Sequence, residues 1–232
     1  MVKRQKQIEP AEFGANIRVF GGGIKTLDGS PTVDDVESEM TVMPHLDNDR
    51  RIEVQGTSRS ARDARQVGCA AQAINRIPNP TEAFHVVVSG KFSLWDVVPT
   101  ILSFAQPATI ENLHIATLGF SKTNIAELCE LIDTRRVERA SLLCSHYFKG
   151  TSTTIYDFAA AAFATRPHTR FLSVRTHAKI LAMKLTDGRR VVVESSANLR
   201  SCKNIEQLTI IGEPKVYDFH RGWIDSIFGV DK

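Results

Sequence analysis

The chain has 232 residues, of which 42% are hydrophobic and 24% are charged. This balance predicts one compact soluble domain with an appended segment, and it excludes a chain that is disordered throughout. No apolar run approaches the ~20 residues that span a bilayer, so we expect no contact with a membrane. The formal net charge of +3 is too small to indicate a class of partner.

The four cysteines are scattered along the chain and form no CxxC pair. This spacing is not that of a zinc site or of a disulfide framework. The basic N-terminus is followed by no apolar segment, which excludes a secretory signal. These features predict reduced cysteines in an intracellular, cytoplasmic protein.

The chain up to residue 80 differs in character from the remainder. Between residues 27 and 53 there are eight acids and two bases among few apolar residues, which predicts an exposed, irregular arm. The pattern over 61–77 predicts a helix, with Ser60 as its N-cap and Pro78 as its stop. We therefore expect an N-terminal arm and helix over residues 1–80.

Residues 81–232 alternate short apolar runs with helical patterns. Continuous apolar strands separated by helices are typical of a sheet covered on both faces, so this part is predicted to be an α/β domain with a mixed sheet flanked by helices. The expected strands are 84–88, 113–118, 140–144 and 171–174. The expected helices are 95–105, 124–134, 153–165 and 215–228, and a hairpin is expected between the last strand and the last helix.

The predicted hairpin centres on Asp187 and Gly188, which both favour the positive φ of a two-residue turn. With these two residues as the loop, Thr186 faces Arg189 across the turn. The apolar, β-branched flanks then pair as antiparallel strands over residues 176–198. A slip of one residue would move every side chain to the other face.

In this register Lys179 lies opposite Ser196 and His177 lies opposite Asn198, so that all four side chains share one face. The combination suits phosphodiester chemistry. A lysine neutralises a phosphate oxygen, an amide and a hydroxyl donate hydrogen bonds to it, and a histidine attacks phosphorus or transfers a proton. Glu206 is expected to hold the histidine ring and fix its tautomer.

These residues form three motifs that together resemble the phospholipase D superfamily, in a single-motif, nuclease-like form. The motifs are His177-Ala178-Lys179, Ser195-Ser196-Ala197-Asn198 and Asn204-Ile205-Glu206. The resemblance covers the chain from about residue 84 onward, and it implies a phospholipase D-like mixed sheet. It also implies metal-independent chemistry without a cofactor, through a covalent phosphohistidine and a second histidine that protonates the leaving oxygen.

Two positions depart from the family pattern. The aspartate that usually lies five residues after the lysine is replaced by Lys184, and the glycine before the motif serine is replaced by Ser195. These changes leave the residues expected to contact phosphate intact. The Lys184 change nevertheless motivates an alternative, a catalytically silent phospholipase D-like module that binds nucleic acid or serves as a scaffold.

One motif supplies only one of the two histidines that the family mechanism needs. The simplest solution is a twofold homodimer that brings His177 of both subunits together. A rival solution lies within the chain, where Ser145 and His146 follow an apolar strand at an edge where α/β sites form. His146 lacks the partner lysine, so we prefer the dimer, and we interpret His85 and His114 as structural.

Residues 166–203 contain nine bases and two acids. Beside a phosphodiester site, such a run is expected to follow a polyanionic backbone, with Arg175, Arg200 and Lys203 as nucleic-acid contacts. The sequence therefore predicts a metal-independent phosphodiesterase, a nuclease acting on DNA or RNA as a homodimer. Cleavage of lipid headgroups is a weaker third option, because no lipid-binding surface is evident.

Overall fold

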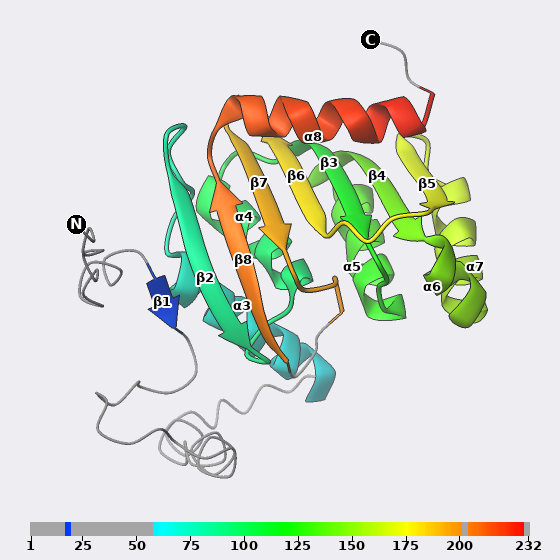
Figure 1. Ribbon diagram of the computed structural model, residues 1–232, viewed down its shortest axis with the longest axis horizontal. Helices are drawn as coiled ribbons and strands as arrows, with labels where there is room; N and C mark the ends of the chain where they lie inside the picture. The colour runs from blue at the N-terminus through cyan, green and yellow to red at the C-terminus, as the bar shows by residue number, and fades with distance from the viewer. Residues whose placement is uncertain (1–16, 20–57, 201–203, 230–232) are drawn as a thin grey trace, which may run out of the picture.

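The computed structural model describes residues 17–19, 58–200 and 204–229. The acidic stretch 27–53 and the predicted contact Lys203 lie outside these residues. The body is an eight-stranded mixed sheet with the order β1-β2-β8-β7-β6-β3-β4-β5 (Figure 1). Its strands are β1 (Ile17–Val19), β2 (Ala83–Ser89), β3 (Ile110–Thr117), β4 (Val137–Ser145), β5 (Thr169–Val174), β6 (Ile180–Leu185), β7 (Arg190–Ser195) and β8 (Ile205–Ile211).

Helices cover both faces of the sheet, which confirms the predicted α/β class with a mixed sheet flanked by helices. One layer carries most of the described helices, and among these α8 alone packs on the other face, against β3, β6 and β7 (Figure 1). None of the helices in the described ranges is long and apolar enough to cross a membrane. The helices are α3 (Ser58–Ile74), the 3-10 turn η2 (Leu94–Asp96), α4 (Val97–Ala105), α5 (Lys122–Asp133), α6 (His146–Thr151), α7 (Thr153–Ala164) and α8 (Pro214–Ile227).

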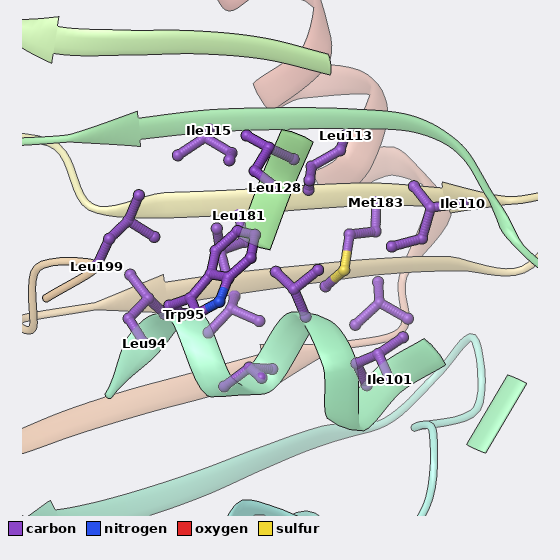
Figure 2. Packing of buried hydrophobic residues seen from close by; sticks show 14 of the residues in the cluster. Leu94, Trp95, Ile101, Ile110, Leu113, Ile115, Leu128, Leu181, Met183 and Leu199 are labelled. Carbon is purple, nitrogen blue, oxygen red and sulfur yellow. The ribbon is translucent and has the colours of Figure 1, made fainter. Parts of the chain in front are cut away.

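The larger core lies between the sheet and the layer that contains α4 and α5. Trp95 and Ile101 point from the η2–α4 segment toward Leu181 and Met183 of β6, as Figure 2 shows. The indole N–H of Trp95 donates to Glu127 of α5, so that this large side chain is buried without losing a hydrogen bond. This packing holds the central strands as a rigid support for the segments at their ends.

The first described helix lies three residues earlier than predicted. Ser60 lies inside α3 and is not its N-cap. The helix ends at Ile74, four residues before Pro78, so the proline is not its stop. Asn75 has φ = 55° and its N–H donates to the carbonyl of Ala71 at 2.9 Å. A left-handed asparagine is a common helix terminator, and it takes the place of the proline as the stop signal. The short helix α6 was not predicted.

The hairpin between β6 and β7 is present, but its predicted register is wrong by one residue. Lys184 pairs with Arg190 and Met183 pairs with Val191. The loop has three residues instead of two, because the N–H of Leu185 donates to the carbonyl of Arg189 at 2.8 Å. Gly188 takes φ = 89°, the left-handed position that a three-residue hairpin loop requires.

The strand directions define two edges of the sheet. Strands β2, β3, β4, β5 and β7 end at one edge, where β6 and β8 begin. We call this the carboxyl edge and the opposite one the amino edge. Ligands of α/β proteins commonly bind at the carboxyl ends of parallel strands, so the carboxyl edge is the expected location of a functional site.

Candidate functional site

All three sequence motifs lie at the carboxyl edge. The segment 175–179 runs from the edge strand β5 past the ends of β4 and β3 to the start of β6, and it is the yellow connection in Figure 1. The second motif follows the end of β7, and the third enters β8. Because β6, β7 and β8 are neighbours in the sheet, the three motifs occupy three adjacent strand ends.

Lys179 and His177 are in direct contact. The Lys179 Nζ lies 3.0 Å from His177 Nδ1 and 3.0 Å from the His177 carbonyl oxygen. An ammonium can only donate, so Nδ1 is the acceptor in this contact and the proton of a neutral ring is on Nε2. His177 is exposed to solvent, whereas Lys179 is only 8% exposed. A solvent-facing imidazole thus lies against a buried cation.

The pKa of Lys179 is lowered, chiefly because burial disfavours the charged ammonium, while the negative charge of Glu206 opposes this shift. Glu206 is therefore close enough to act on the lysine electrostatically, although it belongs to another strand. A lysine held partly desolvated gains more from an incoming phosphate than a hydrated one does. This arrangement fits the predicted role of Lys179 as the neutralising cation.

Ser196 and Glu206 are joined by a hydrogen bond in which the serine hydroxyl donates to the carboxylate. The backbone around them is paired, since Ser196 N–H donates to the Gln207 carbonyl at 3.1 Å and Gln207 N–H donates to Ser196 Oγ at 3.0 Å. The second and third motifs are thereby fastened together. The predicted contact between Glu206 and the His177 ring stays a prediction.

Asn198 is half-buried, and its Oδ1 has no hydrogen-bond donor among the described residues. A buried amide oxygen without a donor costs about 1–3 kcal/mol and calls for an explanation. The NH2 group at the other end of the amide is the part of the Asn198 side chain that could donate to a phosphate oxygen.

The predicted cross-strand pairs are wrong, because Lys179 faces Ser195 and not Ser196. The Ser195 N–H donates to the Lys179 carbonyl at 3.0 Å. Residues 176–179 and 196–198 lie beyond the strand ends, where strict alternation of side chains no longer applies. The motifs therefore come to one edge through chain connectivity, not through the predicted register.

The structure explains the residues found at both positions, 184 and 195, that differ from the phospholipase D pattern. The Ser195 hydroxyl donates to the Gln207 carbonyl at 3.0 Å and accepts from Ala197 N–H at 2.8 Å, which shapes the turn out of β7. Lys184 forms an ion pair of 2.7 Å with Glu111 at the other end of β6. Five residues of strand place it roughly 16 Å along the chain from Lys179. The Lys184 change therefore lies away from the candidate site.

The rival second histidine also lies at the carboxyl edge. His146 follows β4, is exposed, and its Nδ1 lies 3.2 Å from Ser173 Oγ. Ser145 instead serves the fold, since its hydroxyl donates to the Leu118 carbonyl and accepts from Phe148 N–H, both at 2.9 Å. His146 remains available for chemistry, while the Ser145 hydroxyl is occupied by capping α6.

The run of bases over residues 166–203 does not form one surface. Five of its members pair with carboxylates near the amino edge of the sheet: Arg166 with Asp133, Arg170 with Asp225, Lys184 with Glu111, Arg189 with Asp187, and Arg190 with Asp218. Arg175 and Arg200 are exposed beside the motif segments. The expected polyanion track is thus reduced, among the described residues, to Arg175, Lys179 and Arg200.

The structure also reveals polar clusters that the sequence did not predict. His220 of α8 is buried, with its Nε2 2.8 Å from Glu194 Oε1, and Trp223 Nε1–H donates to its Nδ1 at 3.0 Å. His114 is buried as a structural residue would be, but its Nε2 lies 3.3 Å from Asp225 Oδ1. The contact between His220 and Trp223 could have been predicted, because residues three apart on a helix are neighbours. The contact between His114 and Asp225 could not, because 111 residues separate them in the sequence.

No family model matches the chain, and no curated protein matches it. Among solved structures it is similar to polyphosphate kinase from Porphyromonas gingivalis, at 10% identity and a TM-score of 0.48, over 70% of this chain and 29% of that one. It is also similar to yeast tyrosyl-DNA phosphodiesterase, at 14% identity and a TM-score of 0.34, over 56% and 31%. The chain spans less than a third of either protein, and no activity follows from likeness at this level.

Proposed function

We propose that the protein is a metal-independent phosphodiesterase, a nuclease that acts through a phosphohistidine at a dimeric active site. The observation that supports this most directly is the contact between the buried ammonium of Lys179 and the exposed ring of His177. Ser196, Asn198 and Glu206 lie on the two neighbouring strand ends. A cation, an imidazole and the amide of Asn198 thus lie at three adjacent strand ends, where a phosphate is proposed to bind.

In the proposed first step, the His177 ring attacks phosphorus in line with the departing oxygen. A bond forms between the ring nitrogen and phosphorus, the bond from phosphorus to the leaving oxygen breaks, and a second histidine gives that oxygen its proton. Water then attacks the phosphohistidine, returns a proton to the second histidine, and frees the ring. Lys179 turns from Nδ1 to a phosphate oxygen, which lets Nδ1 carry the proton while Nε2 attacks.

The second histidine is proposed to be His177 of another copy of the chain. A twofold axis passing near the carboxyl edge would bring two His177 and two Lys179 side chains around one phosphate. Arg175 and Arg200 are exposed beside the motif segments and are proposed to contact the flanking phosphates of DNA or RNA. His146 is the alternative second histidine within one chain.

The proposal is tested by incubating the purified protein with single- and double-stranded DNA and RNA in EDTA. His177→Ala should lower cleavage about 1,000-fold or more, with an unchanged melting temperature because the side chain is exposed. His85→Ala is the matched control, since His85 is also exposed but lies on β2 near the amino edge. Full activity in His177→Ala would show that His177 is not the nucleophile.

Mixing subunits distinguishes a shared site from an independent one. If both His177 side chains serve one site, equal amounts of wild type and His177→Ala that exchange freely should retain about a quarter of the activity. Independent sites would retain about half. In that second case, loss of cleavage in His146→Ala would identify His146 as the general acid.

A silent nucleic-acid-binding or scaffold module is the second candidate. It is favoured by the Lys179 contact itself, which leaves the proton of a neutral His177 ring on Nε2, the nitrogen that would have to attack. Binding of nucleic acid without cleavage of any strand type, equally in wild type and His177→Ala, would establish this function instead.

A further inference from the structure

The face of the sheet under α8 changes character between its two edges. Toward the carboxyl edge it is apolar: Ala116 of β3 pairs with Leu143 of β4 and Ile180 of β6, and these residues pack with α8. Toward the amino edge it is polar. His114, Ser141 and Arg170 form one row across β3, β4 and β5. A hydrophobic core alone does not call for such a row.

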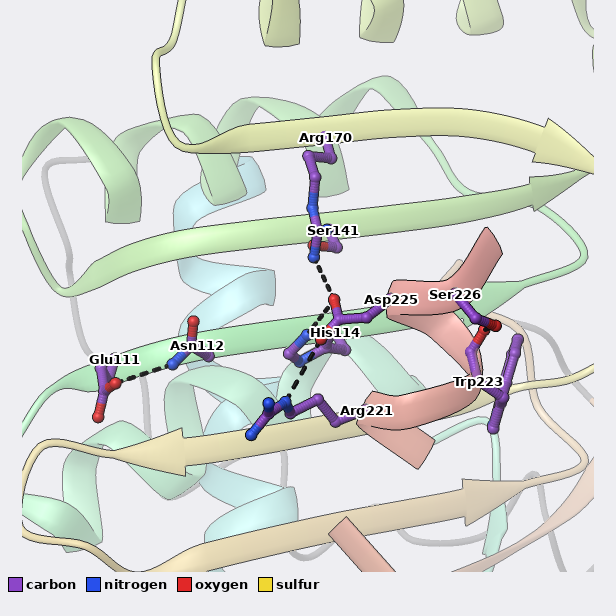
Figure 3. Close-up of polar contacts among 9 residues, drawn as sticks. All are labelled: Glu111, Asn112, His114, Ser141, Arg170, Arg221, Trp223, Asp225 and Ser226. Carbon is purple, nitrogen blue, oxygen red and sulfur yellow. Dashed lines mark hydrogen bonds and ion pairs between the residues drawn. The ribbon is translucent and has the colours of Figure 1, made fainter. Parts of the chain in front are cut away.

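These polar residues line a cavity of about 590 Å³ beside α8. Its floor is buried, since His114 is 4% and Ser141 5% exposed. Figure 3 shows Arg170 reaching across Ser141 to Asp225 of α8, with His114 below and Arg221 on the other side of the carboxylate. The volume lies within the range of small-ligand sites, about 300–1,000 Å³.

The cavity carries more positive than negative side chains. Its cations are Arg139, Arg170, Lys184 and Arg221, and its carboxylates are Glu111 and Asp225. Lys184 pairs with Glu111, whereas Arg170 and Arg221 share Asp225. Apart from its histidines, the lining therefore has a surplus of two positive charges. Arginine guanidinium groups match the oxygens of phosphate, and a phosphomonoester is a dianion near neutral pH.

We propose that this cavity binds a phosphomonoester, separately from the candidate active site at the opposite edge of the sheet. A phosphate alone is much smaller than 590 Å³, so the ligand carries a further group such as a nucleoside or sugar. The phosphate of this ligand lies against Arg139 and against Arg170 and Arg221, the two arginines that pair with Asp225. The ligand is either a free small molecule or the phosphorylated end of a nucleic-acid strand.

The first test is the melting temperature of the full chain at constant ionic strength. AMP should raise it by about 5–10 °C at 100 times its Kd, and adenosine should not. Arg139→Gln should abolish the shift without changing the melting temperature of the free protein, because Arg139 is exposed. Arg65→Gln, on α3 in the opposite layer, should keep the shift.

A second set of measurements separates the cavity from the candidate active site and identifies the source of the phosphate. Lys179→Met should keep the AMP shift, because Lys179 lies at the other edge. If a 5′-phosphorylated tetranucleotide raises the melting temperature more than AMP does, the natural ligand is the end of a nucleic-acid strand. If AMP raises it as much or more, the natural ligand is a small molecule. The proposal is overturned if AMP does not raise the melting temperature or if adenosine raises it equally. It is also overturned if Arg139→Gln keeps the AMP shift or if Lys179→Met loses it.

Discussion

The two edges of the sheet place polar side chains in different ways. At the carboxyl edge, His177, Lys179 and Asn198 lie on irregular segments beyond the strand ends, and His177 faces solvent. At the amino edge, His114 and Arg170 lie on paired strands, and their contacts are fixed by the register of the sheet. A site on irregular segments can change geometry when a ligand arrives, whereas a site on strands is preorganised.

This difference between the two edges predicts that ligand-induced conformational change occurs at the carboxyl edge. The Lys179–His177 contact joins two side chains that, in the proposed mechanism, separate when Lys179 binds a phosphate oxygen. The Arg170–Asp225 contact, in contrast, also positions the end of α8. Substitutions at the carboxyl edge should therefore affect activity more than stability, and those at the amino edge should do the reverse.

After that of His177→Ala, the largest expected effect is that of Lys179→Met on catalysis. Losing the cation that is proposed to neutralise the phosphate should lower kcat about 100- to 1,000-fold. Steady-state cleavage of a nucleic-acid substrate measures this. Lys215→Met, at an exposed position of α8, is the control and should stay within about twofold of wild type.

The same variant should melt no lower than wild type. Burial lowers the pKa of Lys179 in the folded protein, so the folded state holds this proton less tightly than the unfolded chain does. The resulting cost is present while both states carry the proton, and it is lost as the pH rises from the lowered pKa of the folded protein through the ordinary value of 10.5. A methionine of similar length removes that cost. A clear drop in the melting temperature would contradict the proposed division between the two edges.

Asp225→Asn should have the largest effect on stability. Burial opposes ionisation of Asp225, but hydrogen bonds and charges from Arg170 and His114 outweigh it and lower its pKa. Removing the charge leaves two arginines without their carboxylate, and it should lower the free energy of unfolding by about 1–3 kcal/mol. Urea denaturation measures this change.

Asp218→Asn is the matched control on the same helix. Asp218 pairs with Arg190 but is 51% exposed, so its loss should cost less than about 1 kcal/mol. Cleavage by both variants should remain near wild type. A kcat lowered as strongly as in Lys179→Met would show that the two edges are coupled and not separate.

A smaller effect is expected in the pH dependence of stability. Burial lowers the pKa of His114 below its ordinary value of 6.5, although the charge of Asp225 opposes the shift. The unfolded chain then takes up this proton before the folded protein does, so stability should fall as the pH drops through 6.5 toward the folded pKa. His114→Gln should flatten the melting temperature between pH 7 and pH 5. An unchanged slope would exclude His114 as its source.

Local pattern in the sequence was enough to predict strands β2 to β7, most helices and the three motifs at the candidate site. Strand β1 was missed, because it lies in the arm that was expected to be irregular. It failed where a competing local interaction decided the outcome. Asn75 ended α3 before Pro78, and a third loop residue before Gly188 shifted the hairpin register. The cavity escaped prediction for another reason. His114, Arg170 and Asp225 meet only through strand order and helix docking, and no short segment contains that information.

The smallest expected effect concerns the basic residues left at the carboxyl edge. Each phosphate contact contributes about 0.7–0.9 to the slope of log K against log salt, so Arg200→Gln should reduce the slope for nucleic-acid binding by roughly one unit. Arg189→Gln should leave it unchanged, because Arg189 pairs with Asp187 at the hairpin turn, at the opposite edge. Equal losses in the two variants would mean that the nucleic acid contacts both edges. A flat salt response in the wild type would mean that the partner is not a polyanion, and the carboxyl edge would then be a binding site of another kind.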